Sequence, residues 1–283
     1  NNRGDQWSEV SSELFEVLQR AIHFVSKTQG LVTPTLLHPL WDAGYKHSFE
    51  TLPKMSVPSL PVTSVSTPTN VQDTTSANHA NQQIEGIQLR QLADRQHQVY
   101  LPAGMALDLN GYVKGWCAMQ LAENISRVHD WHIPCLVDMG GDIAIGVPKN
   151  PTDKPVSWGV AVAKPYFANS EHVHNDEDVA ILKLSSGAVA TSGQDYRRWL
   201  HDGRWQHHLI HPHDLRPVTS DVLTATVLAK DAMTAEVYAK YCVLLGVKAA
   251  VAWLNKHHIA ALLIDRDNKV MVTSAMRPNL LAS

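Results

Sequence analysis

Residues 107–115 read Leu-Asp-Leu-Asn-Gly-Tyr-Val-Lys-Gly, and this stretch gives the first indication of the fold. Leu107 and Leu109 alternate with polar residues, Gly111 interrupts the alternation, and apolar residues then recur at helical spacing from about Lys114 to Val128. The pattern predicts a strand, a turn and a helix. A glycine turn lets backbone approach a bound group, and the free N–H groups of a following helix favour an anion such as phosphate. The same pattern also occurs in ordinary tight turns.

A second glycine turn follows directly. Leu136 to Asp138 predicts a strand, Gly140-Gly141 a tight turn, and Asp142 to Val147 a strand that leaves it. Both turns resemble places where backbone approaches a phosphate or sugar, although glycine pairs are commoner in ordinary tight turns than in ligand-binding loops.

The remaining pattern favours an α+β fold. Apolar residues from Ser11 to Lys27 recur at helical spacing, with Ser11 as the expected N-cap and Gly30 near the end. Strands outnumber helices and do not alternate strictly with them, as is typical of α+β proteins. The other expected strands are 86–92, 98–101, 157–163, 179–184, 219–229 and 260–265, and the other expected helices are 234–245 and 248–257.

Composition excludes several classes of protein. The 283 residues suffice for one large or two modest domains, and 44% are hydrophobic. A net charge of −3 gives no electrostatic basis for binding nucleic acid or an anionic membrane. Histidine is unusually abundant, at 16 residues. Residues 51–77, rich in Pro, Ser and Thr, predict a long surface loop.

The three cysteines predict no disulfide framework and no thiolate zinc site, since Cys117, Cys135 and Cys242 share no close spacing. We expect them to be buried thiols. Lys240 and Lys248 interrupt the best apolar run, so no membrane span is expected in this chain. The chain has no initiator Met and no signal sequence, which leaves the location open between the cytoplasm and a membrane anchor upstream of Asn1.

Six segments in a fixed order carry a more specific indication. Residues 107–115 are similar to an Asp-Leu-Gly-Gly-x-x-Lys-Gly motif, and 136–142 to a Gly-Gly-Asp/Asn turn. The others are 30–35, 158–165, 190–193 (Ala-Thr-Ser-Gly) and 197–212. With this order of segments the chain resembles the FAD:protein FMN transferases, or ApbE-like flavin transferases.

The resemblance implies a single domain over 1–283, lacking a segment that the family has upstream. The implied fold is α+β and related to the T-fold, with mixed, largely antiparallel sheets packed with helices and an FAD cleft between layers. The implied activity moves FMN from FAD to a Thr or Ser of an acceptor flavoprotein, with Mg²⁺ in the family. The alternatives are a non-catalytic module that binds or senses FAD, and an FAD pyrophosphatase.

Site residues follow from the resemblance position by position. His208 would be the base for the acceptor hydroxyl, with His207 and His211 in the same segment, and the main chain near Val113 would face the metal. The expected FAD contacts are Thr35, Asn110, Gly111, Lys114, Gly140, Gly141, Asp142, Thr191, Ser192, Gly193 and Lys240.

The chain departs from the family at the helix that supplies the metal ligands. Counting back from Gly246 places Glu236 at the family's Asp and Lys240 at its Thr. An ammonium at the second position repels Mg²⁺, so we expect Mg²⁺ to bind poorly. Glu236 and Lys240 are spaced for an i,i+4 ion pair. Two interpretations stay open: Lys240 is a built-in cation beside the FAD diphosphate, or the pair is an ordinary surface salt bridge.

Other positions differ as well. An alternative frame uses Asp231 and Thr234 as the metal ligands but requires an insertion before Gly246. Elsewhere His211 replaces the family's Asp before Pro, Leu215 replaces its Gly, and Thr33 replaces the Asp of its Asp-Pro-Thr motif. Loss of acidic groups lowers affinity for a hard cation, so we expect any bound flavin to survive chelation.

The histidine segment has a rival interpretation. If 206–213 is one strand, His207, His211 and His213 point to one face and His208 to the other. Three imidazoles on one face could bind Zn²⁺ or another transition metal. Exposed or stacked histidines without a metal are the simpler alternative.

Overall fold

The computed structural model describes residues 4–49, 52, 84–92, 96–127, 133–149, 156–165 and 178–281. These residues form two compact units, one from the described residues before 112 together with 198–218, and one from 112–197 together with 219–281. A single domain over 1–283 stays a prediction. The predicted loop at 51–77 lies outside the described residues except for Leu52.

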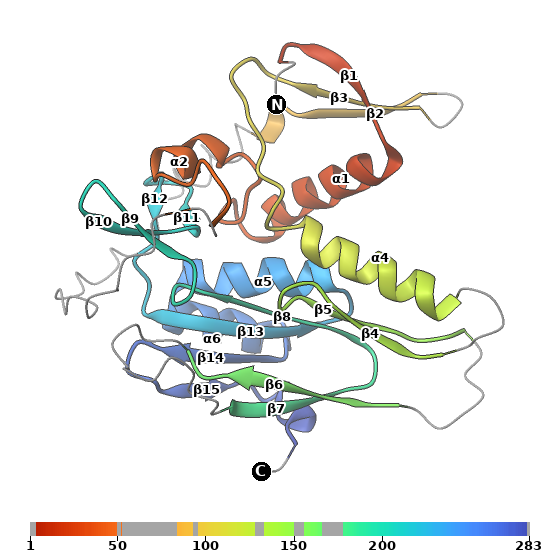
Figure 1. Ribbon diagram of the computed structural model, residues 1–283, viewed down its shortest axis with the longest axis vertical. Coiled ribbons are helices and arrows are strands. Elements are labelled where there is room, and N and C mark those ends of the chain that lie inside the picture. Colours follow the sequence, from red (N-terminus) through yellow and green to blue (C-terminus); the bar gives the residue numbers. More distant parts are fainter. Residues whose placement is uncertain are drawn as a thin grey trace. The chain divides into compact units, whose positions relative to one another are not determined.

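The second unit is built on a six-stranded sheet in which every neighbouring pair is antiparallel (Figure 1). In spatial order the strands are β15 (Val270–Val272), β14 (Ala261–Asp265), β13 (Val222–Ala229), β8 (Gly187–Gly193), β5 (Ile143–Gly146) and β4 (Cys135–Asp138).

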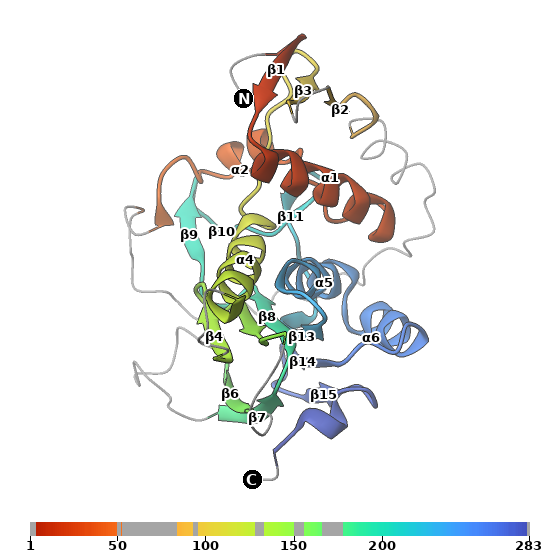
Figure 2. The same ribbon diagram turned by 90° about the vertical axis from the view of Figure 1, so that its right-hand side faces the viewer.

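Helices α4 (Val113–Arg127) and α5 (Ala232–Leu245) pack against this sheet and each other, and α6 (Val247–Lys256) packs beside α5 (Figure 2). Small residues allow α4 and α5 to approach each other closely. A Cβ on Gly115 of α4 would lie 2.7 Å from the backbone of Ala232 in α5. Ala118 and Ala122 of α4 are likewise buried in a cluster of alanines. The first turn of α4 is thereby held against the start of α5.

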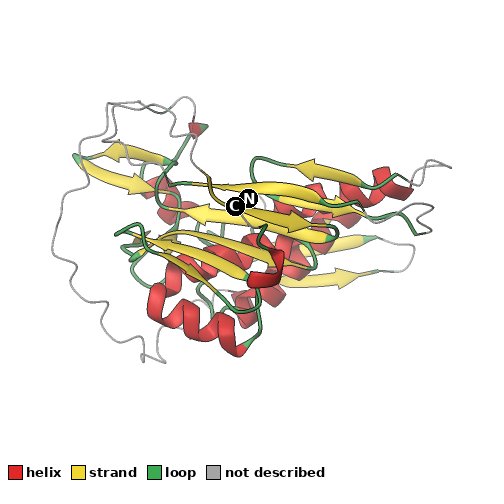
Figure 3. Cartoon of the chain, turned by 90° about the horizontal axis from the view of Figure 1, so that it is seen from below, coloured by secondary structure: helices red, strands yellow, loops and turns green. Residues whose placement is uncertain are grey.

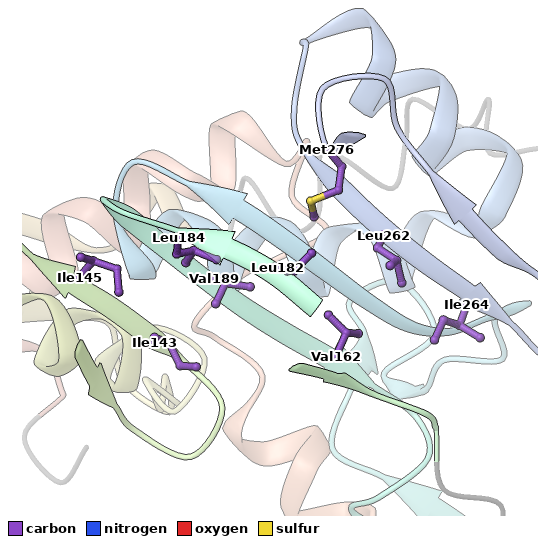
Figure 4. Packing of buried hydrophobic residues seen from close by; sticks show 9 residues of the cluster. All are labelled: Ile143, Ile145, Val162, Leu182, Leu184, Val189, Leu262, Ile264 and Met276. Atoms are coloured by element: carbon purple, nitrogen blue, oxygen red, sulfur yellow. The ribbon is translucent and has the colours of Figure 1, made fainter. Parts of the chain in front are cut away.

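The other face of the sheet packs against the hairpin of β6 (Trp158–Ala163) and β7 (Asp178–Leu184) (Figure 4). Alternation along the strands separates the two faces: Ala144 of β5 belongs to the alanine cluster, while Ile143 and Ile145 belong to the core beneath the hairpin. Leu182 is fully buried there, and burying a leucine side chain contributes about 1.5–3 kcal/mol. The last described segment covers this core through Met276 and the 3-10 helix η4 (Arg277–Asn279).

The first unit contains the three-stranded antiparallel sheet β1 (Gln6–Val10), β3 (His97–Leu101) and β2 (Gln88–Gln91), with helix α1 (Ser12–Lys27). The Ser11 hydroxyl accepts the Leu14 N–H at 3.2 Å, which confirms the expected N-cap. Leu18 and Val25 of α1 pack with Val99 of β3 in a buried cluster. Leu107 and Leu109 pack against the same cluster.

A smaller part of the first unit holds the histidine segment. It contains α2 (Leu37–Asp42) and the hairpins β9 (Arg198–His201) with β10 (Arg204–His207), and β11 (Ile210–His211) with β12 (Arg216–Pro217). Trp199 is 2% exposed, and its Nε1 donates to the Ala43 carbonyl at 2.6 Å. This bond fixes β9 to the end of α2.

The α+β class with largely antiparallel sheets is confirmed, and Figure 3 shows the helices in red and the strands in yellow. The expected strand at Leu107–Leu109 is wrong. Those leucines alternate because both are packed on the α1 cluster, while the Asp108 N–H donates to the Pro34 carbonyl rather than to a strand. The expectation of buried thiols holds only for Cys242, since Cys117 and Cys135 are partly exposed.

No helix among the described residues is long and apolar enough to cross a membrane.

Candidate functional site

Lys114 lies in the first turn of α4 and forms an ion pair through its Nζ with Oδ2 of Asp142. Asp142 is only 2% exposed, whereas the Lys114 side chain keeps 35% of its surface exposed. The lysine therefore neutralises a buried carboxylate and still presents part of its side chain to solvent.

The turn before Asp142 explains how the carboxylate is positioned. Gly140 and Gly141 have φ values of 71° and 92°, a left-handed conformation that glycine adopts without strain. The Gly141 N–H donates to Oδ1 of Asp138 at 2.7 Å, and the Met139 N–H donates to the Asp142 carbonyl at 3.0 Å. The two glycines thus form the turn of the β4–β5 hairpin, and Asp142 follows them directly before β5.

Helix α5 contributes the second buried carboxylate. Glu236 is 1% exposed, and its Oε1 lies 2.9 Å from Nζ of Lys240 and 3.8 Å from Nζ of Lys114. Its Oε2 accepts the Gly115 N–H at 3.1 Å. The predicted i,i+4 pair is confirmed, but it is not a surface salt bridge because the Lys240 side chain is only 15% exposed.

The four side chains form what we call the ion cluster: Lys114, Asp142, Glu236 and Lys240, with a formal charge of zero. Burial above all, and then the charge of Glu236, raise the pKa of the Asp142 carboxyl above its usual range, while Lys240 and Lys114 oppose this rise. Two close carboxylates in a dry setting need nearby positive charge to stay ionised. The two lysines supply it.

Asp231 and Thr234, the alternative pair of metal ligands, have a structural role at the start of α5. Asp231 is the N-cap of α5: its Oδ1 accepts the Thr234 N–H at 3.0 Å, and its Oδ2 accepts the Thr234 hydroxyl at 2.8 Å. Capping satisfies an N–H group that the helix leaves without a partner. This arrangement favours the frame with Glu236 and Lys240.

The Ala-Thr-Ser-Gly segment forms the end of β8 in the same unit. Thr191 is exposed, and its Oγ1 lies 2.9 Å from Oγ1 of Thr226 on β13, while Ser192 is 7% exposed. A Cβ on Gly193 would lie 2.5 Å from Oδ1 of Asp195, so this position admits only glycine without rearrangement. Their expected role as flavin contacts stays a prediction.

Other predicted contacts lie in the first unit. Thr35 is half-buried, and its hydroxyl lies 2.9 Å from that of Thr33. Asn110 is exposed, and its N–H donates to Oδ1 of Asp108 at 3.0 Å, which closes a local turn before Gly111. Val113 is the first residue of α4, in the second unit.

Residues 206–213 do not form the single strand that the zinc interpretation required, because β10 ends at His207 and β11 is only Ile210–His211. The proposed single face of His207, His211 and His213 is therefore absent. His207 is 7% exposed; its Nε2 lies 2.8 Å from the Val218 carbonyl, and its Nδ1 accepts the Leu209 N–H. These contacts give His207 a structural role. His208, half-buried, occupies the break between β10 and β11.

His213 and His211 gather around Asp214 on the turn that follows. Nδ1 of His213 lies 2.8 Å from Oδ1 of Asp214, and Nδ1 of His211 lies 3.8 Å from Oδ2. Within the described part of the chain, no three His, Cys, Asp or Glu side chains are placed to hold a metal ion. The zinc interpretation thus finds no support there.

His211 should make stability depend on pH. Burial, partly opposed by Asp214, lowers the pKa of the His211 ring from its usual value. The folded chain then binds fewer protons than the unfolded chain, so stability falls as pH drops below about 6.5. We expect the wild type to lose more free energy of unfolding between pH 7.5 and 5.5 than His211→Asn loses, as measured by urea unfolding. The exposed His23→Asn should behave as wild type, and an unchanged pH dependence in His211→Asn would contradict the prediction.

Among the predicted site residues, the structure brings together Lys114, Asp142, Glu236 and Lys240 in the second unit. The first unit holds Thr35, Asn110, Gly111, His207, His208 and His211. Sequence reasoning missed Gly115 as the backbone donor to Glu236. The glycine after Lys114 was the available signal, since only a residue without a side chain lets the two helices approach this closely.

Known proteins are similar to this chain over most of its length. A model of the ApbE family matches residues 1–263. An FAD:protein FMN transferase of Treponema pallidum is 26% identical over 94% of this chain and 69% of its own length. One of Vibrio cholerae is 25% identical over 96% of this chain and 73% of its own length.

Solved structures share the fold. The ApbE protein of Thermotoga maritima has a TM-score of 0.74 at 23% identity, covering 99% of this chain and 82% of that one. The flavin transferase ApbE of Vibrio cholerae has a TM-score of 0.62 at 24% identity, covering 98% of this chain and 80% of that one.

Proposed function

The chain belongs to the ApbE family, and on that basis we propose that it transfers FMN from FAD to a Ser or Thr hydroxyl of an acceptor flavoprotein. The observation that supports this most directly is the ion cluster. Lys114 comes from the segment 107–115, Asp142 from 136–142 and Glu236 from the helix aligned with the family's metal helix, and all three meet. Three segments that resemble family motifs thus converge on one place in the second unit.

The reaction needs positive charge at a diphosphate. The acceptor oxygen forms a bond to the phosphorus of the FMN half, the bond from that phosphorus to the bridging oxygen breaks, AMP leaves, and the hydroxyl proton passes to a base. Negative charge on the phosphoryl oxygens is stabilised by cations. Lys114 is suited to this because its side chain is partly exposed beside the buried carboxylates. From the family resemblance, we propose His208 as the base that accepts this proton.

The Mg²⁺ ion that the resemblance implies does not fit the donors present. Each carboxylate of the ion cluster already contacts an ammonium, and the position of the family's Thr holds Lys240, 2.9 Å from Glu236. Two unit charges of like sign 4 Å apart repel by about 4 kcal/mol at an effective dielectric constant near 20, and a divalent ion doubles this. The proposed chemistry therefore relies on lysines for its positive charge.

Incubation of the purified protein with FAD and an acceptor flavoprotein domain tests the proposal. The acceptor in this test is a domain that the Vibrio cholerae relative flavinylates. We expect a fluorescent acceptor band on a denaturing gel, an FMN adduct by mass spectrometry, and one AMP released per adduct. Free FMN and AMP without an adduct would make the protein a pyrophosphatase instead. Neither product, under conditions where the relative is active, would refute the proposal.

Lys114→Ala tests the role of Lys114 in transfer, and Lys248→Ala is its matched control. We expect Lys114→Ala to lower the transfer rate by about 100-fold or more, because it removes the exposed cation that faces the diphosphate. Lys248→Ala, on the exposed side of α6, removes an equal charge outside the ion cluster and should leave the rate within about twofold. Equal rates for Lys114→Ala and Lys248→Ala would exclude Lys114 from the site.

A further inference from the structure

The Asp142 and Glu236 carboxylates are both buried and share one cation, Lys114, whose Nζ pairs with Asp142 and lies 3.8 Å from Glu236. A buried carboxylate is stable only when its charge is compensated and its oxygens accept hydrogen bonds. One lysine balances one of the two negative charges. The second carboxylate needs another positive charge.

A divalent cation is one way to supply that charge, since Mg²⁺ and Mn²⁺ bind carboxylate oxygens. Here Lys240 supplies it. Its Nζ donates to Oε1 of Glu236 at 2.9 Å, and its side chain is only 15% exposed, so the ammonium is held within the protein. Lys240 lies one helical turn after Glu236, on the same face of α5.

The oxygens of Glu236 are also engaged. Oε1 faces both ammonium groups, and Oε2 accepts the Gly115 N–H at 3.1 Å. A metal ion entering here would have to displace an ammonium that its own charge repels. The formal charge of the ion cluster is already zero, so nothing in it attracts a further cation.

We propose that Lys240 takes the place of a divalent cation at the Asp142–Glu236 pair, so that the protein binds no divalent ion there, and that removal of the lysine opens a divalent-cation site. The proposal rests on the proposed function only in its consequence for catalysis: FMN transfer proceeds at the same rate in the presence of a chelator.

Mn²⁺ titration followed by electron paramagnetic resonance tests the proposal without FAD or acceptor, so that its failure and the failure of the transfer reaction are distinguishable. In the wild type, the free-ion signal should show no stoichiometric Mn²⁺ site at Mn²⁺ concentrations up to about millimolar, the range in which weak calcium sites of proteins bind. Lys240→Thr should bind one Mn²⁺ at least about tenfold more tightly than wild type, and Mg²⁺ should displace it.

Four further variants complete the design. Lys240→Gln fills more of the space and serves where Lys240→Thr fails to fold, as judged by circular dichroism. Lys240→Arg keeps the cation and should bind no Mn²⁺, and Lys248→Thr on α6 should match wild type. Stoichiometric Mn²⁺ binding by the wild type, at a site lost in Glu236→Gln, would overturn the proposal. Folded Lys240→Thr or Lys240→Gln that binds no Mn²⁺ would overturn it too.

Discussion

Replacement of His208 by alanine is expected to lower the rate of FMN transfer by at least about 100-fold, because a positioned base contributes roughly 10²- to 10⁴-fold to such reactions. His208 occupies the break between β10 and β11 and is half-buried. Neighbouring His207 has both ring nitrogens in contact with backbone groups, so His207 is poorly placed to act as the base. Single-turnover transfer of FMN to the acceptor domain measures the effect.

Two further measurements separate catalysis from folding. FAD affinity should stay within about threefold in His208→Ala, and the acidic limb of the pH profile should disappear, which a structural role would not cause. His213→Ala is the matched control, since His213 lies five residues further on and is half-exposed. A His208→Ala variant that transfers FMN at the wild-type rate would remove His208 from the mechanism.

Gly115→Ala should strongly destabilise the second unit. The new Cβ would lie 2.7 Å from the carbonyl carbon and oxygen of Ala232 and 2.8 Å from the Met233 nitrogen, all of them helix backbone that cannot rotate away. Overpacking costs about 1–3 kcal/mol, and a shift of α4 that relieves the clash would break the buried hydrogen bond from the residue 115 N–H to Glu236, which adds about 1–3 kcal/mol. We therefore expect the free energy of unfolding in urea to fall by about 3 kcal/mol or more.

Gly159→Ala provides the comparison. Its Cβ would meet only side-chain ends, at 3.2 Å from Ile181 and 3.7 Å from Leu281, and residue 159 is exposed on β6. The expected change is below about 0.5 kcal/mol, typical of surface substitutions. If Gly115→Ala and Gly159→Ala lose the same stability, the close approach of α4 and α5 does not constrain the fold.

Periodicity predicted the elements that bury one face, such as α1, α4 and the β6–β7 hairpin. It missed β8, whose residues Gly187–Gly193 are mostly Gly, Ala, Ser and Thr. That strand forms because β5 and β13 pair with it on both sides, which is tertiary rather than local information. Periodicity could not decide whether 206–213 is one strand, since a two-residue strand and a tight turn leave no measurable period.

Within the candidate site, the distance along the chain decided what was predictable. The Glu236–Lys240 pair follows from helix geometry alone. The pairing of Lys114 with Asp142 spans 28 residues, and the bond from Gly115 to Glu236 spans 121 residues. Those contacts depend on how the sheet and helices pack. The burial of Lys240 could not be predicted either, because α5 is apolar on nearly every side.

The i,i+4 spacing of Glu236 and Lys240 also bears on how the chain reaches its native state. Helix α5 carries its own counterion, so Glu236 can be neutralised as soon as the helix forms, before the distant Lys114 arrives. Docking α5 onto the nascent sheet then requires neither a bare carboxylate in the core nor an ion drawn from solution. The yield of folded protein should therefore be independent of how much divalent metal its surroundings contain.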